Sequence, residues 1–232
     1  MRGDRVAWMN RRERALQQIE DRIYRLTVGG PPDSRWQRLL NLAIERGYAA
    51  AVVRRRLGLP TPLDTADRRI LEETIFPYYR SDTGFKKVLF VGCAIFTSHY
   101  QRQFFADQEF WTLEPEFYQA RFGSTNHLIA PIEDASKHFS PGYFDVIYCN
   151  GIYGWGVDTL AQGEAAFAQC HSCLRSGGHL VFGWNDVPQR TPFSLDEIQS
   201  RKAFRHFQFP PLDTWRYFTK TRHRHVFDFY QK

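Results

Sequence analysis

The sequence predicts an α/β fold with a doubly wound, mostly parallel sheet and a helical extension at the N-terminus. From residue 86 onward, short apolar segments alternate with stretches of helical spacing. Several of these segments are apolar nearly throughout, which is typical of parallel strands covered by helices on both faces. Because crossovers between parallel strands are right-handed, such a chain winds helices onto both faces of the sheet. The first 80 residues show no strand pattern.

The expected elements of the sheet domain follow one another in a regular order. Strands are predicted at residues 86–92, 109–115, 127–134, 144–150 and 178–185. Helices are predicted to start at Thr97, to run from Thr159 to Leu174, and to occupy residues 194–204. Residues 205–209 and 224–232 are predicted to form a terminal antiparallel pair.

The N-terminal extension is predicted to be helical throughout. Apolar residues recur at helical spacing in residues 6–26, 34–47, 48–60 and 66–80. A Gly-Gly-Pro-Pro run breaks the chain after the first helix, and Asp64 or Thr65 is expected to cap the fourth. The predicted domains are therefore a helical extension or lid at residues 1–80 and the sheet domain at residues 81–232.

The composition excludes several classes of protein. At 232 residues, of which 43% are hydrophobic, the chain is long enough for one substantial core. No apolar stretch approaches the roughly 20 residues that cross a bilayer, and the N-terminus has no apolar signal-peptide core. We therefore expect a soluble, cytoplasmic protein without a membrane span.

The four cysteines are expected to be reduced, because a chain of this length needs no disulfide staples. Cys170 and Cys173 form a C-x-x-C, with His179 nearby. No second C-x-x-C or H-x(3–5)-H pair completes a zinc site, and the pair lies late in an expected helix. The pattern favours buried cysteines on that helix, and no metal site is predicted.

The formal charge of +6 is concentrated at the N-terminus. Residues 1–60 hold 13 arginines and six acidic residues, a net +7, so residues 61–232 sum to about −1. The N-terminal segment is thus the place for any contact with nucleic acid or an acidic membrane surface. Its arginines are interleaved with Glu13, Glu20 and Asp21, which favours a solvated helix face instead.

Ligands of open parallel sheets bind beyond the carboxyl ends of the strands. The residues expected there are Gly92 to Thr97, Glu114, Glu133 and Asp134, Asn150 to Trp155, and Asn185 and Asp186. At the tip of the second strand, Glu114 is predicted to accept hydrogen bonds from both hydroxyls of a ribose. Asp134 is predicted to accept one from the adenine amino group of the same ligand.

The turn after the first strand favours one kind of adenosine cofactor. A dinucleotide needs successive glycines there, so that the backbone can approach its pyrophosphate. Gly92 is present, but Ile95 and Phe96 would obstruct that approach, and the chain has no G-x-x-x-x-G-K-[ST] loop. S-adenosylmethionine carries an adenosine and no phosphate, so it is the predicted cofactor.

Five segments, "VLFVGCAIFTSHY", "FWTLEPE", "APIEDA", "FDVIYCN" and "LRSGGHLVFGWND", occur in a familiar order and spacing. Over about residues 86–232 the chain resembles the class I S-adenosylmethionine-dependent methyltransferases. In that family's [DE]-x-G-x-G-x-G turn, Phe90 replaces the acid here, and Ala94 and Phe96 replace the later glycines. The resemblance implies a seven-stranded, Rossmann-like sheet. It implies a cofactor site formed by Gly92, Cys93, Ala94, Thr97, Glu114, Asp134 and Asn150.

The loop at residues 149–158 lies where such enzymes present the methyl acceptor. Its glycines display Tyr153 and Trp155, which are predicted to bind the acceptor beside the sulfonium by cation–π attraction. A hydrophobic lid is the alternative. The catalytic candidates are Asn150, Tyr153 and Asp186, of which Asp186 would orient or deprotonate the acceptor. A loop-capping role for Asp186 stays open, and His99 is a less favoured candidate.

The predicted function is methylation of a small organic acceptor at oxygen or nitrogen. The 16% aromatic content and the loops rich in Trp and Tyr favour such an acceptor over a polymer. Asn150-Gly151-Ile152-Tyr153 has the outline of the N-P-P-Y motif of amino-group methyltransferases, without its prolines. A nucleic-acid or protein N-methyltransferase is therefore one alternative. The other is a non-catalytic, methyltransferase-like binding protein in which the side chains of Ile95 and Phe96 fill the corner, the turn after the first strand.

Overall fold

The computed structural model describes residue 63 and residues 65–221 and 223–232. The chain divides into two compact units, residues 1–54 and 55–232. The helices predicted at 6–26, 34–47 and 48–60, the basic segment and the candidate cap Asp64 lie outside the described residues. The boundary between residues 80 and 81 stays a prediction, and the helix that precedes it packs on the sheet of the second unit.

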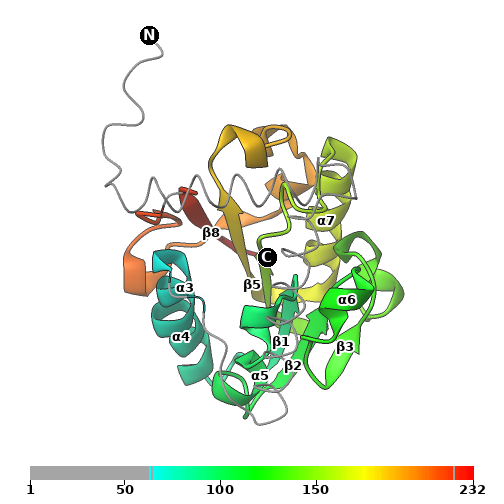
Figure 1. Cartoon of the computed structure of the whole chain (residues 1–232), viewed down its shortest axis with the longest axis vertical. Coiled ribbons are helices and arrows are strands. Elements are labelled where there is room, and N and C mark those ends of the chain that lie inside the picture. The colour runs from blue at the N-terminus through cyan, green and yellow to red at the C-terminus, as the bar shows by residue number, and fades with distance from the viewer. Residues whose placement is uncertain (1–62, 64, 222) are drawn as a thin grey trace, which may run out of the picture. The chain divides into compact units, whose positions relative to one another are not determined.

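An eight-stranded sheet forms the centre of this unit (Figure 1). Its strands are β1 (Lys87–Val91), β2 (Glu109–Leu113), β3 (Asn126–Leu128), β4 (Phe144–Asn150), β5 (Leu174–Asn185), β6 (Arg205–His206), β7 (Arg216–Phe218) and β8 (His225–Gln231). The strand order is β3-β2-β1-β4-β5-β8-β6, and β7 also pairs with β8. Strands β1 to β5 are parallel, and β8 is antiparallel to β5. The predicted doubly wound, mostly parallel sheet is confirmed.

The end of the sheet accounts for the difference between seven predicted strands and eight observed. β6 and β7 pair with successive parts of β8, so two short strands share the last position. The predicted pairing of residues 205–209 with 224–232 is found between β6 and β8. Strand β7 was not predicted, because three residues flanked by turns carry too short a pattern to recognise.

The third strand is shorter than its apolar run. Only Asn126–Leu128 forms β3, and Ile132–Lys137 forms a 3₁₀ helix instead of continuing the predicted strand to residue 134. The pairing with β2 ends at Leu128, and Pro131 has no N–H to donate, so the strand does not resume before the 3₁₀ helix. The prediction that Asp134 ends a strand is therefore wrong.

A continuous helix precedes the sheet. It consists of α3 (Ala66–Ile70), a π-helical turn (Leu71–Ile75) and α4 (Phe76–Ser81). Pro77 lies inside it, although proline lacks the donor that a helix interior needs. The wider π turn lies directly before Pro77, where it accommodates the ring and the missing hydrogen bond.

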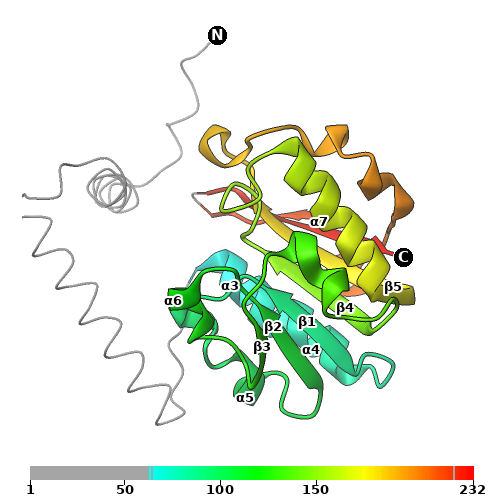
Figure 2. The ribbon, with the colours of Figure 1, turned by 90° about the vertical axis from the view of Figure 1, so that its right-hand side faces the viewer.

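Two hydrophobic clusters cover the two faces of the sheet. The helix α7 (Leu160–Cys173) covers one face, and the helix 66–81 covers the other (Figure 2). Successive β1 residues alternate between them: Leu89 and Val91 face α7, whereas Val88 and Phe90 face the helix 66–81. The short helices α5 (Tyr100–Gln103) and α6 (Phe117–Ala120) follow β1 and β2. No described helix is long and apolar enough to span a membrane.

The C-x-x-C lies on α7, where both cysteines are buried, as predicted. The Cys170 sulfur is 3.6 Å from that of Cys149 on β4. The Cys149 thiol and burial raise the pKa of Cys170, and burial raises the pKa of Cys173 to about 12. Neutral buried thiols pack as small apolar groups. Within the described ranges, no cluster of three or more His, Cys, Asp or Glu residues could hold a metal ion.

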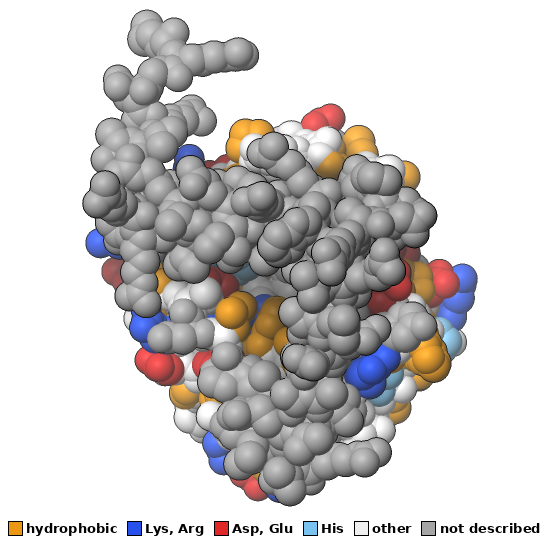
Figure 3. Space-filling view, viewed as in Figure 1, with side chains coloured by type: hydrophobic (Ala, Val, Ile, Leu, Met, Phe, Trp, Pro, Cys, Tyr) orange, Lys and Arg blue, Asp and Glu red, His pale blue; other side chains and the backbone are white. Residues whose placement is uncertain are grey.

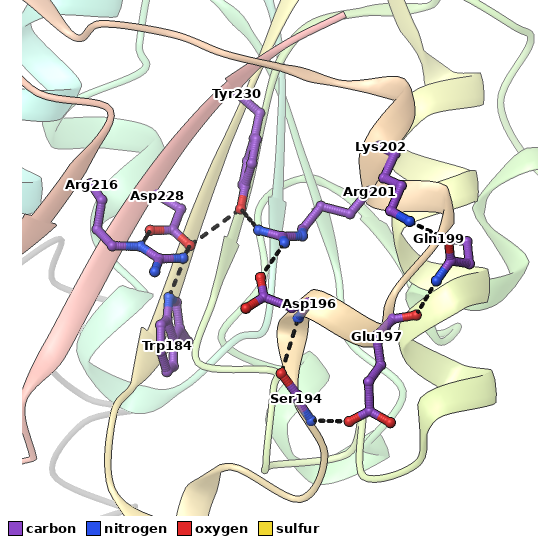
Figure 4. Close-up of polar contacts among 10 residues, drawn as sticks. All are labelled: Trp184, Ser194, Asp196, Glu197, Gln199, Arg201, Lys202, Arg216, Asp228 and Tyr230. Carbon is purple, nitrogen blue, oxygen red and sulfur yellow. Dashed lines mark hydrogen bonds and ion pairs between the residues drawn. The ribbon is translucent and has the colours of Figure 1, made fainter.

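A buried ion pair holds the C-terminal strands together (Figure 4). Asp228 on β8 is fully buried, and Arg216 on β7 donates to it from Nε at 2.5 Å and from Nη2 at 2.7 Å. The Trp184 indole and the Tyr230 hydroxyl donate to the same carboxylate, each at 3.2 Å. Arg201 then links Tyr230 to Asp196 on the segment after β5. The network ties β5, β7, β8 and that segment into one body.

Candidate active site

The strand order reverses between β1 and β4, and their carboxyl ends define the candidate site. Gly92 follows β1 with a φ of +90°, and its N–H donates to the Leu113 carbonyl of β2 at 2.9 Å. A Cβ at this position would lie 3.3 Å from the Ile152 side chain and 3.4 Å from the Asn150 carbonyl oxygen. Glycine is therefore favoured here by conformation and by the close approach of the chain after β4.

Glu114 connects the tips of β1 and β2. Its side chain is buried, and Oε2 accepts from the Cys93 amide at 2.9 Å. Oε1 accepts from the Glu116 amide, also at 2.9 Å. Each carboxylate oxygen has a second acceptor position. The carboxylate is thus fixed in orientation by two backbone donors and can still accept from a ligand.

A threonine closes the turn that lacks glycines. The Thr97 hydroxyl accepts from the Ala94 amide at 3.0 Å and donates to the Ala94 carbonyl at 2.9 Å. Residues Ile95–Thr97 form a 3₁₀ turn. The Phe96 ring lies under the guanidinium of Arg68 on α3, 4.4 Å from ring centroid to Cζ. The turn therefore packs toward α3.

Asp134 is not part of the hydrogen-bond network that surrounds Glu114 in the described residues. It is part of the 3₁₀ helix 132–137 and pairs with Lys137 at 2.8 Å, with 38% of its side chain exposed. No hydrogen bond or ion pair within the described residues connects it to Glu114. Its role toward an adenine stays a prediction.

Asn150 ends β4 and belongs to a polar triplet in which Asn150 and His225 are buried and Asn185 is half-buried. Oδ1 of Asn150 lies 3.0 Å from Nε2 of His225, whose Nδ1 lies 2.7 Å from Oδ1 of Asn185. Burial lowers the pKa of His225 to about 4, so the imidazole is neutral near pH 7. A neutral imidazole has one donor and one acceptor, so one of the two amides must turn its NH₂ group toward the ring. The triplet joins β4, β5 and β8 at the site.

The backbone of Gly183 makes room for the triplet. A Cβ at Gly183 would lie 1.9 Å from Asn150 Oδ1 and 2.9 Å from His225 Nε2. No side chain fits at this position while Asn150 and His225 keep their places.

Replacing Gly183 by alanine should lower the free energy of unfolding by about 1–3 kcal/mol, because the new methyl group displaces the Asn150 amide. Urea unfolding would measure the loss. In an Asn150→Ala background the same replacement should cost less, because the clashing amide is gone. Equal costs in both backgrounds would show that the clash is not with Asn150.

Tyr153 and Trp155 occupy different environments on the loop after β4. Tyr153 is 1% exposed, its hydroxyl donates to the Phe193 carbonyl, and its ring packs edge-on against Trp184 and Phe193. Trp155 is 56% exposed, with the Arg190 guanidinium 3.2 Å from the centroid of its ring. These contacts bury Tyr153 and leave Trp155 as the accessible aromatic side chain of the loop. The catalytic and acceptor-binding roles of Tyr153 stay a prediction.

Asp186 follows β5 beside the start of β8. Its carboxylate pairs with Arg224 at 2.7 Å, and its N–H donates to the Arg224 carbonyl at 3.1 Å. The side chain is 34% exposed, so it is accessible to solvent at the edge of the site. The contacts with Arg224 also anchor the chain that carries His225. This anchoring corresponds to the loop-capping role that the sequence leaves open for Asp186.

Sequence reasoning missed His225 and Arg68. His225 is brought to Asn150 and Asn185 by the antiparallel register of β8 on β5. Arg68 reaches the turn after β1 from a helix that precedes the sheet. Both contacts are long-range, and the local pattern around either residue carries no signal for them.

Comparison with known proteins supports the fold. No family model matches the sequence, and no curated protein matches it. The N-methyltransferase NodS from Bradyrhizobium japonicum WM9 is 15% identical with a TM-score of 0.55, covering 73% of this chain and 99% of its own. The same protein in complex with S-adenosyl-L-homocysteine is 14% identical with a TM-score of 0.53, covering 73% and 93%. A TehB-like methyltransferase from Corynebacterium glutamicum ATCC 13032 Kitasato is 15% identical with a TM-score of 0.52, covering 82% and 98%.

These similarities, together with the strand order, define the class of fold. The chain has the Rossmann-like fold of the class I S-adenosylmethionine-dependent methyltransferases.

Proposed function

We propose that this protein is an S-adenosylmethionine-dependent methyltransferase that methylates a small organic acceptor at oxygen or nitrogen. The observation that carries the proposal is the Glu114 carboxylate. It is buried at the tip of β2 and held by the amides of Cys93 and Glu116, next to the turn at Gly92. A carboxylate oriented in this way suits the two hydroxyls of a ribose, since each oxygen retains a position for a further donor.

The turn at residues 92–97 fits a cofactor without phosphate. Backbone amides that would otherwise face an anion are already used: Gly92 donates to Leu113, Cys93 to Glu114, and Ala94 to Thr97. A pyrophosphate would need several free amides at this point. An adenosine whose linkage to its tail carries no phosphate needs none of them.

The residues around the corner support binding of the rest of the cofactor. Ile129, directly after β3, is 54% exposed, and Phe117, three residues beyond Glu114, is 72% exposed. Exposed apolar side chains beside a ribose-binding carboxylate suit the faces of an adenine. Asp134 remains our candidate for the adenine amino group.

Bound S-adenosylmethionine supplies an electrophilic methyl group on a sulfonium. The chain's own task is to hold the acceptor in line with that group, and geometry of this kind accounts for much of such a rate. Asn150 is the proposed positioning group, because one end of its amide contacts His225 and the other makes no hydrogen bond to a described residue. Asp186 is the proposed base for an acceptor that must lose a proton, since it is part-exposed at the adjacent strand end.

The acceptor is proposed to be small and partly apolar. Trp155 offers an exposed aromatic surface on the loop that follows Asn150, with Arg190 on one face of its ring. Among the coloured residues of Figure 3, Lys and Arg side chains are interspersed with Asp and Glu. A nucleic-acid acceptor would favour a continuous basic field.

Replacing Glu114 by alanine should weaken binding of S-adenosylhomocysteine by about 1.5–3 kcal/mol, because the charged acceptor of the ribose hydroxyls is lost. Titration calorimetry with S-adenosylmethionine and S-adenosylhomocysteine would measure the affinities. Glu116→Ala is the matched control, since only the backbone amide of Glu116 contacts Glu114.

Three results would count against the proposal. Unchanged affinity in Glu114→Ala would remove the ribose contact. Absence of binding by the folded wild-type protein at millimolar ligand would favour the non-catalytic alternative. Binding of RNA or DNA that weakens steeply with salt would favour the nucleic-acid alternative.

A further inference from the structure

Arg68 is a buried cation with unused hydrogen-bonding capacity. Its side chain lies on α3, and the residue is 8% exposed. Nη1 donates to the Tyr100 hydroxyl at 2.8 Å, whereas the buried Nε has no partner among the described residues. Burying a charged donor without a partner is costly, so a ligand or water is expected to complete it.

A second unpartnered nitrogen belongs to the same region. His99 is 6% exposed, and its Nδ1 has no partner among the described residues. Burial, with a smaller effect of Arg68, lowers the pKa of His99 to about 4, so its ring is neutral near pH 7. A neutral imidazole can present an N–H at Nδ1. Two buried side chains near each other thus have donors that no described residue uses.

Phe96 connects this region to the cofactor corner. The Arg68 guanidinium lies 4.4 Å from the centroid of the Phe96 ring, and Phe96 is in the turn that follows Gly92. Arg68 therefore lies over the part of the chain where the family's second and third glycines are replaced. Arg68 is positioned to supply a side-chain contact there.

The local acids only partly balance Arg68. The Tyr100 hydroxyl donates to Glu72 at 2.7 Å, so Glu72 is coupled to Arg68 through Tyr100. Burial raises the pKa of Glu72, which disfavours its ionised form. Asp67 and Glu73, the other acids of this helix, form no ion pair with a described residue. A further anion would therefore be stabilised beside the guanidinium.

The free edge of Arg68 suits a carboxylate. Nε and Nη2 lie on one side of a guanidinium and bind both oxygens of a carboxylate at once. Arg216 uses this same edge on Asp228, at 2.5 and 2.7 Å. Neither nitrogen of this edge in Arg68 hydrogen bonds to a described residue.

We propose that Arg68 and His99 form an anion subsite that binds the carboxylate of the methionine tail of S-adenosylmethionine. The subsite replaces contacts that a glycine-rich turn would make, and it lies on the helix before the sheet and on the turn after β1. The inference rests on the proposed function, because it presumes that the adenosine binds at Glu114.

Calorimetry with two ligands separates this subsite from the rest of the pocket. S-adenosylhomocysteine carries the carboxylate, whereas 5′-methylthioadenosine has the same adenosine and sulfur without the amino-acid tail. Arg68→Met should weaken S-adenosylhomocysteine by about 10- to 100-fold, because a charge-assisted contact is lost. Binding of 5′-methylthioadenosine should stay within about twofold. The affinity of Arg68→Lys for S-adenosylhomocysteine should fall between those of Arg68→Met and wild type. Lysine keeps the charge but lacks the two parallel N–H donors of the guanidinium.

A distant arginine serves as the control. Arg80→Met removes the same charge from an exposed pair with Asp107 and should change neither affinity. Thermal melts would verify that each variant is folded. Equal weakening of both ligands by Arg68→Met, or no weakening of S-adenosylhomocysteine, would overturn the subsite while leaving the proposed function intact. A wild-type protein that binds neither ligand would overturn the proposed function, and the subsite with it.

Discussion

Replacing Asp228 by alanine is expected to lower the free energy of unfolding by about 3 kcal/mol or more, the usual cost of breaking a buried ion pair. Asp228 is fully buried, and the Arg216 side chain is 26% exposed. Loss of the carboxylate leaves the guanidinium without its bidentate partner. It also removes the acceptor of the Trp184 indole and the Tyr230 hydroxyl. Urea unfolding of the full chain would measure the change.

An exposed ion pair provides the comparison. Asp107 pairs with Arg80 at 3.3 Å, but 81% and 48% of the two side chains are exposed. Asp107→Ala should therefore cost less than about 1 kcal/mol. If Asp228→Ala lowers the free energy of unfolding no more than Asp107→Ala does, the buried ion pair contributes no more to stability than the exposed one.

A double variant tests the cause of the loss. Arg216→Met combined with Asp228→Leu removes both charges and fills the space with apolar side chains. Such replacements of buried pairs are often neutral or stabilising. We expect the double variant to be more stable than Asp228→Ala alone, because no uncompensated charge remains. A double variant as unstable as the single one would instead indicate that the contacts themselves matter.

The Asp228 network also bears on the candidate site. β8 begins at His225, three residues before Asp228, and Trp184 packs against Tyr153 on the loop after β4. The ion pair therefore secures the strand that carries His225 to Asn150. A loosened β8 is expected to disturb the site even though Asp228 lies outside it.

The strand tips were predictable because local patterns determine them. Apolar runs located β1, β2, β4 and β5, and the parallel sheet brings their carboxyl ends to one edge. That reasoning was sufficient to bring Gly92 and Glu114 into the same corner, where the Cys93 amide now links them. It failed at β3, since the apolar run through Pro131 is typical of one strand, whereas the paired strand ends at Leu128 and Pro131 has no N–H with which to continue it.

Phe90 shows why the glycine motif alone was ambiguous. In the sequence, Phe90 stands where the motif has an acidic residue, which suggests that the motif has lost one of its functional groups. In the structure its ring packs edge-on against Phe76 and Tyr100 in the core under the helix 66–81. The substitution therefore belongs to a continuous aromatic core, and the contacts of that core are long-range and absent from any local pattern.

Tyr153 and Arg68 also show that a local pattern does not predict the long-range contacts of a side chain. Glycine neighbours made Tyr153 look displayed, but the segment around Phe193 covers it. No local pattern distinguishes Arg68 on its helix, but it lies over Phe96 at the turn. Burial of a single side chain depends on which segments fold over it, and that information is distributed along the chain.

Acidification is expected to destabilise the protein between about pH 6.5 and pH 4. His99, His179 and His225 are buried, and burial lowers the pKa of each to about 4. In the unfolded chain a histidine has a pKa near 6.5. Within this window the unfolded state binds protons that the folded state does not, so the free energy of unfolding falls as pH falls. Each histidine contributes about 1.4 kcal/mol per pH unit.

Urea unfolding at pH 7.5, 6.0 and 5.0 would measure the slope, and His179→Gln should reduce it by one histidine's share. His179 contacts Tyr79 at the end of β5 away from the candidate site, so its replacement leaves the corner intact. His138, which is exposed, is the control position. Stability that stays level from pH 7.5 to 5.0 would contradict the prediction. Because ordinary carboxyl groups titrate near pH 4, a loss already present above pH 5 would be attributable to the buried histidines.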